Sequence, residues 1–252
     1  VLSSLKISDA AHMEDDDARK LIELAMWASE PIPFDPMEVA LHAAYINTSL
    51  LDERPHYKMI KEYPLEGKPP MMTHLFGKDP GRRIIAAKGA PEAMMKVSGL
   101  AADEMQQAED VVKNLAAEGY RVLGVGEALS AGNNFPATQQ EFKFNFRGIV
   151  AFYDPPKKNI QAVLEAFYAA GITVKIITGD NSATTTAIAK QIGFRGYEKS
   201  ITGDEIMKLN NDELKIKVAD TFVFTRMFPD AKLKIINSLK ERNEIVAMTG
   251  DG

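Results

Sequence analysis

The chain has 252 residues, of which 45% are apolar and 26% charged, a composition typical of folded globular proteins rather than disordered ones. Its net charge of −5 argues against a general nucleic-acid binder, and the absence of cysteine excludes disulfides and thiolate metal sites. No apolar run approaches the ~20 residues that span a bilayer, and the acidic N-terminal stretch is unlike a signal peptide, so we expect the chain by itself to be soluble.

Residues 1–142 mix helices and strands in an irregular order. Apolar residues at helical spacing predict a helix from Asp16 to Ser29, and a second helix is expected from Met37 to Leu50, after a proline-rich turn. Glycine and proline turns separate the segments that follow. We expect strands at residues 57–64, 72–76, 83–87 and 121–128, and helices at residues 91–97 and 102–118.

Residues 143–252 alternate strands and helices regularly. We expect strands at residues 146–153, 172–177, 221–225 and 244–248, and helices at residues 157–171, 181–193, 203–219 and 229–243. This alternation predicts an α/β domain with a parallel sheet covered on both faces. Ligands of such sheets bind beyond the carboxyl ends of the strands, which is where a site should be sought.

Charged and hydroxyl side chains follow each of these predicted strands. The four groups are Asp154–Lys157, Thr178–Asn181, Arg226 with Lys232 on the next helix, and Thr249–Gly252. We expect them to converge on one edge of the sheet, where carboxylates and a phosphate would suit Mg²⁺ and a lysine would place a point charge on the phosphate. One Thr-Gly-Asp turn is common turn chemistry, and Lys232 alone would be an ordinary helix lysine. Two such turns at two strand ends favour a site.

Taken in order, several stretches resemble the P-type ATPases. They are KGAPE at 88–92, DPPK at 154–157, TGDN at 178–181, FTRMFPDAKLKII at 224–236 and TGDG at 249–252, together with FDPMEVAL at 34–41. Their order and spacing agree over nearly the whole chain. The resemblance implies a haloacid-dehalogenase-like phosphorylation domain, here residues 143–252. It also implies an inserted α+β nucleotide-binding domain with an antiparallel sheet, here residues 1–142.

The resemblance also implies roles for individual residues. For ATP binding these are Lys88 with Gly89 and Ala90 in the pocket, Glu38 at the adenine side and Arg121 at the phosphates. The phosphate-facing set of the other domain is Asp154, Thr178, Gly179, Asp180, Arg226 and Lys232, and Asp251 helps to hold Mg²⁺. Without the resemblance, Gly89 would be only a turn residue, Glu38 a solvated helix glutamate and Arg121 a strand-edge charge.

Two features depart from the family pattern. The strand that should supply an aromatic ring and a lysine beside the adenine carries Leu65 and Pro70 in those slots, with Tyr63 and Lys68 as candidate replacements. The family's phosphorylated aspartate, in a DKTGT motif, does not occur in this sequence. We therefore expect a fragment that binds ATP weakly and does not turn it over by itself, with the phosphorylation domain lacking its nucleophile strand.

The expected function is the cytosolic ATP-binding and phosphorylation portion of a cation pump, on the cytoplasmic side of an integral membrane parent. Calcium is the expected ion, because the motifs are most similar to those of the calcium-type branch. A soluble haloacid-dehalogenase-type phosphatase is one alternative, but it needs an aspartate after an early buried strand, and Asp9, Asp15 and Asp17 do not follow one. A non-catalytic nucleotide-binding module is the other. A DKTGT motif and apolar segments in a longer sequence would favour the pump.

Overall fold

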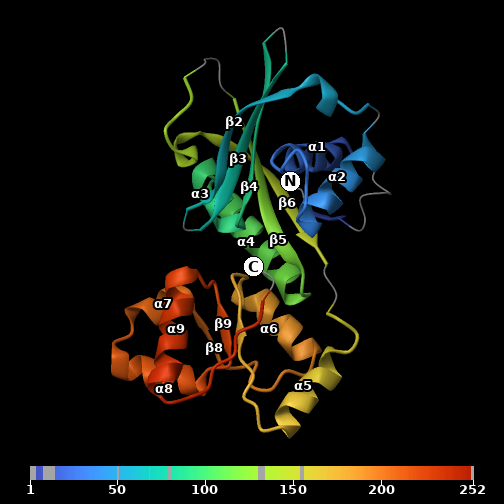
Figure 1. The fold of residues 1–252 in the computed structure, drawn as a ribbon. Coiled ribbons are helices and arrows are strands. Elements are labelled where there is room, and N and C mark those ends of the chain that lie inside the picture. The colour runs from blue at the N-terminus through green and yellow to red at the C-terminus, as the bar shows by residue number, and fades with distance from the viewer. Residues whose placement is uncertain are drawn as a thin grey trace. The chain divides into compact units, whose positions relative to one another are not determined.

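The computed structural model describes residues 4–7, 15–49, 51–67, 69–78, 81–129, 134–153 and 156–250 (Figure 1). These residues form two compact units, each with its own core. The first unit comprises Val1–Leu115 and Tyr120–Tyr153, and the second comprises Ala116–Gly119 and Asp154–Gly252. The main division therefore follows Tyr153 rather than residue 142, where the change in sequence pattern placed the domain boundary.

The first unit contains a six-stranded sheet in the order β1-β6-β5-β4-β3-β2. The strands are β1 (Ser4–Lys6), β2 (Lys58–Glu66), β3 (Met71–Lys78), β4 (Arg82–Gly89), β5 (Arg121–Ala128) and β6 (Phe144–Phe152). Strands β2 to β6 pair antiparallel, and β1 pairs parallel with β6. The expected antiparallel sheet is thus present.

Strand β6 corrects one expectation. Its sequence predicted the first strand of the second domain's parallel sheet, but it pairs antiparallel with β5 along its length, from Arg121 opposite Phe152 to Ala128 opposite Phe144. The residues from Gly148 to Phe152 are buried, since β6 lies inside the sheet and helices cover both faces. An apolar strand of this kind fits a parallel or an antiparallel sheet equally well, so the sequence did not distinguish them.

Two pairs of helices cover the faces of this sheet (Figure 1). Helices α1 (Asp16–Trp27) and α2 (Pro36–Thr48) lie on one face, and α3 (Pro91–Ser98) and α4 (Ala102–Ala117) lie on the other. Short 3₁₀ turns occur at Arg54–His56 and Gln139–Glu141. All four α-helices were predicted from the sequence. Asp15 and Asp35 fix the starts of α1 and α2, because their carboxylates accept hydrogen bonds from backbone N–H groups of the first turn.

Alternate residues of each strand separate the two halves of this core. Ala86, Val125 and Val150 pack with α1 and α2. Their neighbours Ile85 and Ala87 pack on the opposite face with α3. Period-two alternation of this kind is what a sheet covered on both faces requires.

The second unit is built on a parallel sheet in the order β7-β9-β8. Its strands are β7 (Ile176–Ile177), β8 (Ser200–Thr202) and β9 (Val223–Thr225). Helices α5 (Ile160–Ala169) and α6 (Ser182–Gln191) pack on one side of it, and α7 (Gly203–Lys208), α8 (Asn211–Asp220) and α9 (Pro229–Glu241) on the other (Figure 1). This is the α/β arrangement that the alternating pattern predicted.

Three local expectations in this unit were wrong. Residues 203–219 form two helices, because Asn210 caps α8 and interrupts the helix. The strand expected at 172–177 is regular only at β7, and β8 was missed because it is only three residues long. Residues 244–248 are not a strand: Ile245 and Met248 are exposed, and no described strand pairs with them. None of the described helices is long and apolar enough to cross a bilayer.

Candidate functional site

A buried ion pair joins strand β4 to the helices above it. The Nζ atom of Lys88 lies 2.5 Å from Oε1 of Glu38 and donates a second hydrogen bond of 2.7 Å to Oγ of Ser29. Lys88 is only 5% exposed and Glu38 only 7%. The structure therefore brings together two of the predicted nucleotide-site residues, and it adds Ser29, which no sequence motif had marked.

Local structure explains how the pair forms. Lys88 shares a strand face with Ala86, so its side chain points toward α1 and α2. Glu38 is in the first turn of α2, where the helix dipole favours a carboxylate, and Pro36 occupies the first helical position. Ser29 follows Ala28, the C-cap of α1, and its hydroxyl donates to the carbonyl of Ala25 at 2.9 Å. Three elements thus meet at one ammonium group.

Burial dominates the electrostatics of Lys88. Loss of hydration lowers the pKa of its ammonium group from the usual value, and the hydrogen bond and charge of Glu38 oppose that change. Removing one partner of such a pair leaves a buried uncompensated charge, which costs about 3–5 kcal/mol. The Lys88–Glu38 contact therefore contributes to the position of α2 on the sheet.

Gly89 and Ala90 form the turn from β4 into α3. A Cβ atom on Gly89 would lie 2.6 Å from the Cα atom of Met71 and from the carbonyl oxygen of Pro70, so the approach of β3 to β4 requires glycine. The N–H of Ala90 donates to the carbonyl of Pro70 at 2.9 Å. Packing therefore accounts for both residues, and their contact with a nucleotide stays a prediction.

Arg121 lies on the same sheet face as Lys88 but farther along. It begins β5, whereas Val125 is the residue of β5 that pairs with Lys88. Four residues of strand separate the two positions by about 13 Å. The register thus places the two predicted nucleotide contacts on one face, and it does not place Arg121 at the Lys88–Glu38 pair.

The residues weighed as adenine contacts lie elsewhere. Tyr63 is buried on the opposite face, against Phe142, and its hydroxyl donates to the carbonyl of Pro136 at 2.6 Å. Leu65 is 64% exposed, and Lys68 is outside the described residues. Tyr63 therefore does not present its ring on the face of Lys88.

A small cavity lies beside the ion pair on the α1 and α2 side. Its volume is about 150 Å³, below the roughly 300 Å³ at which ligand pockets begin. Aromatic side chains, a histidine and an arginine line much of it: Trp27, His42, Arg54, Tyr57 and Phe76. Trp27 packs against Tyr57 and Phe76 and is a core residue, as expected.

An arginine determines the tautomer of the histidine in this cavity. Nη1 of Arg54 lies 3.0 Å from Nδ1 of His42, and because guanidinium only donates, Nδ1 must be the acceptor. Asp52 holds the arginine through both oxygens, at 2.9 and 2.7 Å. Burial, then the charge of Arg54, lowers the pKa of His42. The imidazole is therefore kept neutral.

In the second unit, two strand ends meet as the sequence predicted. The N–H of Thr178 donates to the carbonyl of Phe224 at 2.9 Å, and the N–H of Met227 donates to Thr178 at 3.0 Å. The N–H of Arg226 donates to the carbonyl of Asp180 at 2.9 Å. The turn through Gly179 thus lies directly against Arg226, at the carboxyl ends of β7 and β9.

Local hydrogen bonds shape this turn. The Thr178 hydroxyl accepts from the N–H of Asp180 at 3.1 Å, and Asn181 caps α6 by accepting from the N–H of Thr184 at 2.8 Å. Arg226 has a φ of 51°, a left-handed conformation that is uncommon outside glycine. Such a backbone, held by flanking hydrogen bonds, is a feature that often marks a functional turn.

Lys232 is half-buried in the first turns of α9, which begins three residues after Arg226. Its ammonium group pairs with no side chain in the described part of the chain. Asp154 and Asp251, the other two predicted carboxylates, lie outside the described residues. Their convergence on this turn therefore stays a prediction.

Comparison with known proteins decides the family. The family model for haloacid dehalogenase-like hydrolases matches residues 38–252. The chain belongs to this family. The match covers both the Lys88–Glu38 pair and the turn beside Arg226.

Curated relatives of this haloacid dehalogenase-like chain are cation-transporting ATPases. A calcium-transporting ATPase of Bacillus subtilis is 32% identical over 232 residues, covering 86% of this chain and 26% of that protein. Calcium-transporting ATPase 1 of Saccharomyces cerevisiae is 28% identical over 235 residues, covering 86% and 25%. A probable cation-transporting P-type ATPase of Mycoplasma genitalium is 33% identical over 225 residues, covering 86% and 24%. The chain thus spans about a quarter of the length of these relatives, and the P-type resemblance is confirmed.

Proposed function

We propose that this chain is the ATP-binding and phosphorylation portion of an ATP-driven cation pump that works through an aspartyl-phosphate intermediate. The names of its relatives support cation transport as the function of the parent protein. In this proposal the first unit binds ATP, and the second unit holds the phosphoryl group. The parent protein crosses the membrane, and this portion lies on the cytoplasmic side.

The turn through Thr178, Gly179 and Asp180 beside Arg226 carries the proposal. Its backbone is hydrogen-bonded to Arg226 and Met227 at the carboxyl ends of β7 and β9, with the Thr178 hydroxyl in the turn and Lys232 on the helix that follows. Phosphoryl transfer depends mostly on positioning and on neutralising charge at the phosphate oxygens. Groups held in advance by a backbone of this kind supply both without rearranging during the reaction.

The donor atoms at this edge are of the kind that Mg²⁺ prefers. The Asp180 carboxylate and the Thr178 hydroxyl are hard oxygen donors, and the proposal adds the carboxylates of Asp154 and Asp251. Bound Mg²⁺ would neutralise charge on the phosphate. Lys232 would pair with the transferred phosphoryl group, and Arg226 would fix the turn against β9.

The first unit would contact ATP through Lys88, Gly89, Ala90, Glu38 and Arg121. Because the Lys88 ammonium is buried and already paired, its amine should react slowly with labelling reagents even without nucleotide. Bound ATP should slow it further. In the phosphatase alternative an early aspartate would be the nucleophile. Asp15 caps α1 and Asp17 lies in the first turn of that helix, so the helix start accounts for these two. Asp9, which follows β1 in the sequence, lies outside the described residues.

MgATP binding to the intact chain tests the phosphate site. Lys232→Ala removes one charge-assisted contact of about 1.5–3 kcal/mol and should weaken MgATP binding about tenfold or more in calorimetry. Lys240→Ala, which changes an exposed lysine near the end of the same helix, is the control and should leave affinity unchanged. Equal affinities for wild type and Lys232→Ala would contradict the role of Lys232.

The transported ion is tested on the parent protein. We propose calcium, because the Bacillus subtilis and Saccharomyces cerevisiae relatives are named as calcium-transporting. Vesicles that contain the full-length protein should accumulate labelled Ca²⁺ when ATP is added. Accumulation of another cation, with none of Ca²⁺, would contradict calcium as the transported ion but would still support ATP-driven cation transport.

A further inference from the structure

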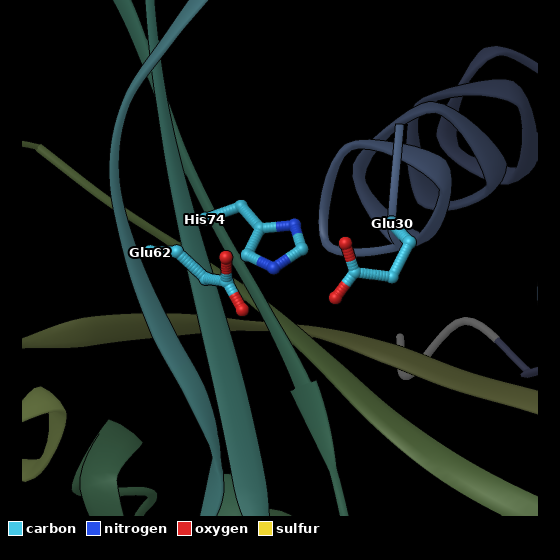
Figure 2. A group of neighbouring side chains, drawn as sticks. All are labelled: Glu30, Glu62 and His74. Carbon is cyan, nitrogen blue, oxygen red and sulfur yellow. The ribbon is translucent and has the colours of Figure 1, made fainter. Parts of the chain in front are cut away.

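Three side chains with metal-binding atoms gather on the first unit's sheet, on the face covered by α1 and α2. Figure 2 shows the imidazole of His74 between the carboxylates of Glu30 and Glu62. One ligand atom from each residue lies within 4.8 Å of the other two. None of these residues was a candidate from the sequence, because they are separated along the chain and match no metal motif.

The fold places these three residues together. Glu62 of β2 and His74 of β3 are directly opposite in the antiparallel pair, which brings their Cβ atoms to about 5 Å. Their neighbours Tyr63 and Leu75 pack on the opposite face. Glu30 follows the end of α1, and its N–H donates to Oε2 of Glu38 at 3.4 Å.

The hydrogen bonds of His74 leave one nitrogen facing the carboxylates. The side chain is fully buried, and Nδ1 lies 3.0 Å from the carbonyl oxygen of Ser29. A carbonyl only accepts, so Nδ1 carries the hydrogen and Nε2 of the neutral ring has a free lone pair. Nε2 is buried and has no hydrogen-bond partner in the described structure. A buried acceptor between two carboxylates is unfavourable unless a proton or a metal cation joins them.

We propose that Glu30, Glu62 and His74 bind a divalent cation of the zinc class. One imidazole nitrogen and two carboxylate oxygens suit Zn²⁺, whereas Mg²⁺ and Ca²⁺ prefer oxygen donors alone. The backbone carbonyl that holds Nδ1 is the kind of partner that orients metal-bound histidines. Zinc ligands lie about 3.5 Å apart around the ion, and Glu62 can close the remaining distance by side-chain rotation because it is exposed. Three protein ligands leave a fourth position for water.

The cation would act on the ion pair described above. Ser29 accepts from Lys88 through its hydroxyl and from His74 through its carbonyl. Glu30 donates to Glu38 through its N–H. A cation held by Glu30 and His74 would therefore fix the segment that positions Lys88 and Glu38. The inference does not depend on the proposed pump function, because it concerns metal binding to the first unit alone.

Zinc titration of the chelator-treated intact chain, without nucleotide, tests this site. We expect one Zn²⁺ per chain in calorimetry, with much weaker binding of Mg²⁺. Glu62→Gln should weaken Zn²⁺ binding about tenfold or more, since a lost outer-sphere partner alone costs 10–100-fold. Glu66→Gln is the matched control, because it changes an exposed glutamate on the same strand, and it should bind as the wild type does.

Nitrogen NMR of His74 distinguishes two states of this cluster. In one, a metal cation binds the neutral imidazole, and in the other, a protonated imidazolium bridges the two carboxylates. The metal-free ring should show Nδ1 protonated and Nε2 bare at neutral pH, and Zn²⁺ should shift Nε2. A protonated Nε2 that Zn²⁺ does not move would overturn the proposal, as would equal Zn²⁺ affinity in Glu62→Gln and wild type. Both readouts need only a folded chain, and Glu62 is exposed, so Glu62→Gln should keep the fold.

Discussion

The Lys88–Glu38 pair shows how one residue acquires its properties from its neighbours. The sequence offered Lys88 as a nucleotide contact by resemblance. The structure shows that it is buried, with Ser29 and Glu38 as hydrogen-bond partners. A structural role and a nucleotide contact are compatible for Lys88, because a lysine held in one geometry is better prepared for a ligand than a mobile one. A stability measurement can separate the structural contribution from a binding role.

A double-mutant cycle measures that contribution. Lys88→Met and Glu38→Gln should each lower the free energy of unfolding by about 3–5 kcal/mol, because each leaves a buried group without its partner. The double variant should lose less than the sum of the two. Urea unfolding followed by the fluorescence of Trp27, the single tryptophan, reports on this unit. Additive losses would show that the two side chains do not interact, and Lys96→Met on the exposed side of α3 should change stability by less than about 0.5 kcal/mol.

The neutral state of His42 predicts a dependence of stability on pH. Its folded-state pKa lies below the ordinary value of 6.5, with burial as the main cause and Arg54, Lys88 and Glu38 as the charged neighbours. The unfolded chain therefore binds the proton more readily, and stability is lost as pH falls from about 6.5 toward the folded-state pKa.

This loss cannot exceed about 1.4 kcal/mol per pH unit for one group. Urea unfolding of wild type and His42→Asn between pH 5 and 8 measures it, because asparagine keeps an acceptor for Arg54 but does not titrate. The wild type should lose more stability than the variant on acidification. Parallel curves would show that His42 does not contribute.

At the scale of elements, most helices were predictable because residues next to each helix in the sequence define where it begins. Asp15, Asp35 and Asn181 each accept hydrogen bonds from first-turn N–H groups, and each directly precedes its helix in the sequence. Asn210 does the same for α8, but the break it makes after α7 was not predicted. The strands of the second unit were harder, because a short strand is defined by its neighbours' hydrogen bonds. Residues 244–248 have a strand-like sequence and no described partner.

Two lysines complete helix ends in the second unit, a role that the sequence did not show. Nζ of Lys175 donates to the carbonyls of Val218 at 2.8 Å and Thr221 at 2.6 Å, at the end of α8. Nζ of Lys234 donates to the carbonyls of Ile206 and Leu209, at the end of α7. Both satisfy carbonyls that a helix end leaves without partners, and a cation there also suits the helix dipole.

Replacing Lys175 should therefore destabilise the second unit. Lys175→Met keeps the aliphatic part of the side chain but leaves the carbonyls of Val218, Ala219 and Thr221 without this donor, at a cost of about 1.5–3 kcal/mol. Lys190→Met, an exposed lysine of α6, is the control and should stay within about 0.5 kcal/mol of the wild type. Urea unfolding followed by circular dichroism measures the loss. An unchanged curve for Lys175→Met would mean that water replaces the ammonium group at no cost.

At the scale of the whole molecule, the chain consists of two units with separate cores. The change from an irregular to an alternating order of strands and helices indicated two domains and placed the division at residue 142. In the structure, β6 belongs to the first sheet. The two boundaries differ because β6 is hydrogen-bonded to β5 and β1 of the first sheet. Hydrophobic pattern alone does not specify a partner strand.

The sequence by itself determined the helices apart from the break between α7 and α8, most strands of the first unit, the α/β character of the second and the turn through Thr178, Gly179 and Asp180. These follow from local signals: caps, turn residues and hydrophobic periodicity. Only the tertiary structure decided where β6 pairs, why Lys88 is buried, and that Glu30, Glu62 and His74 share one place. Such features depend on contacts between residues far apart in the chain, and no local pattern encodes which distant segments will meet.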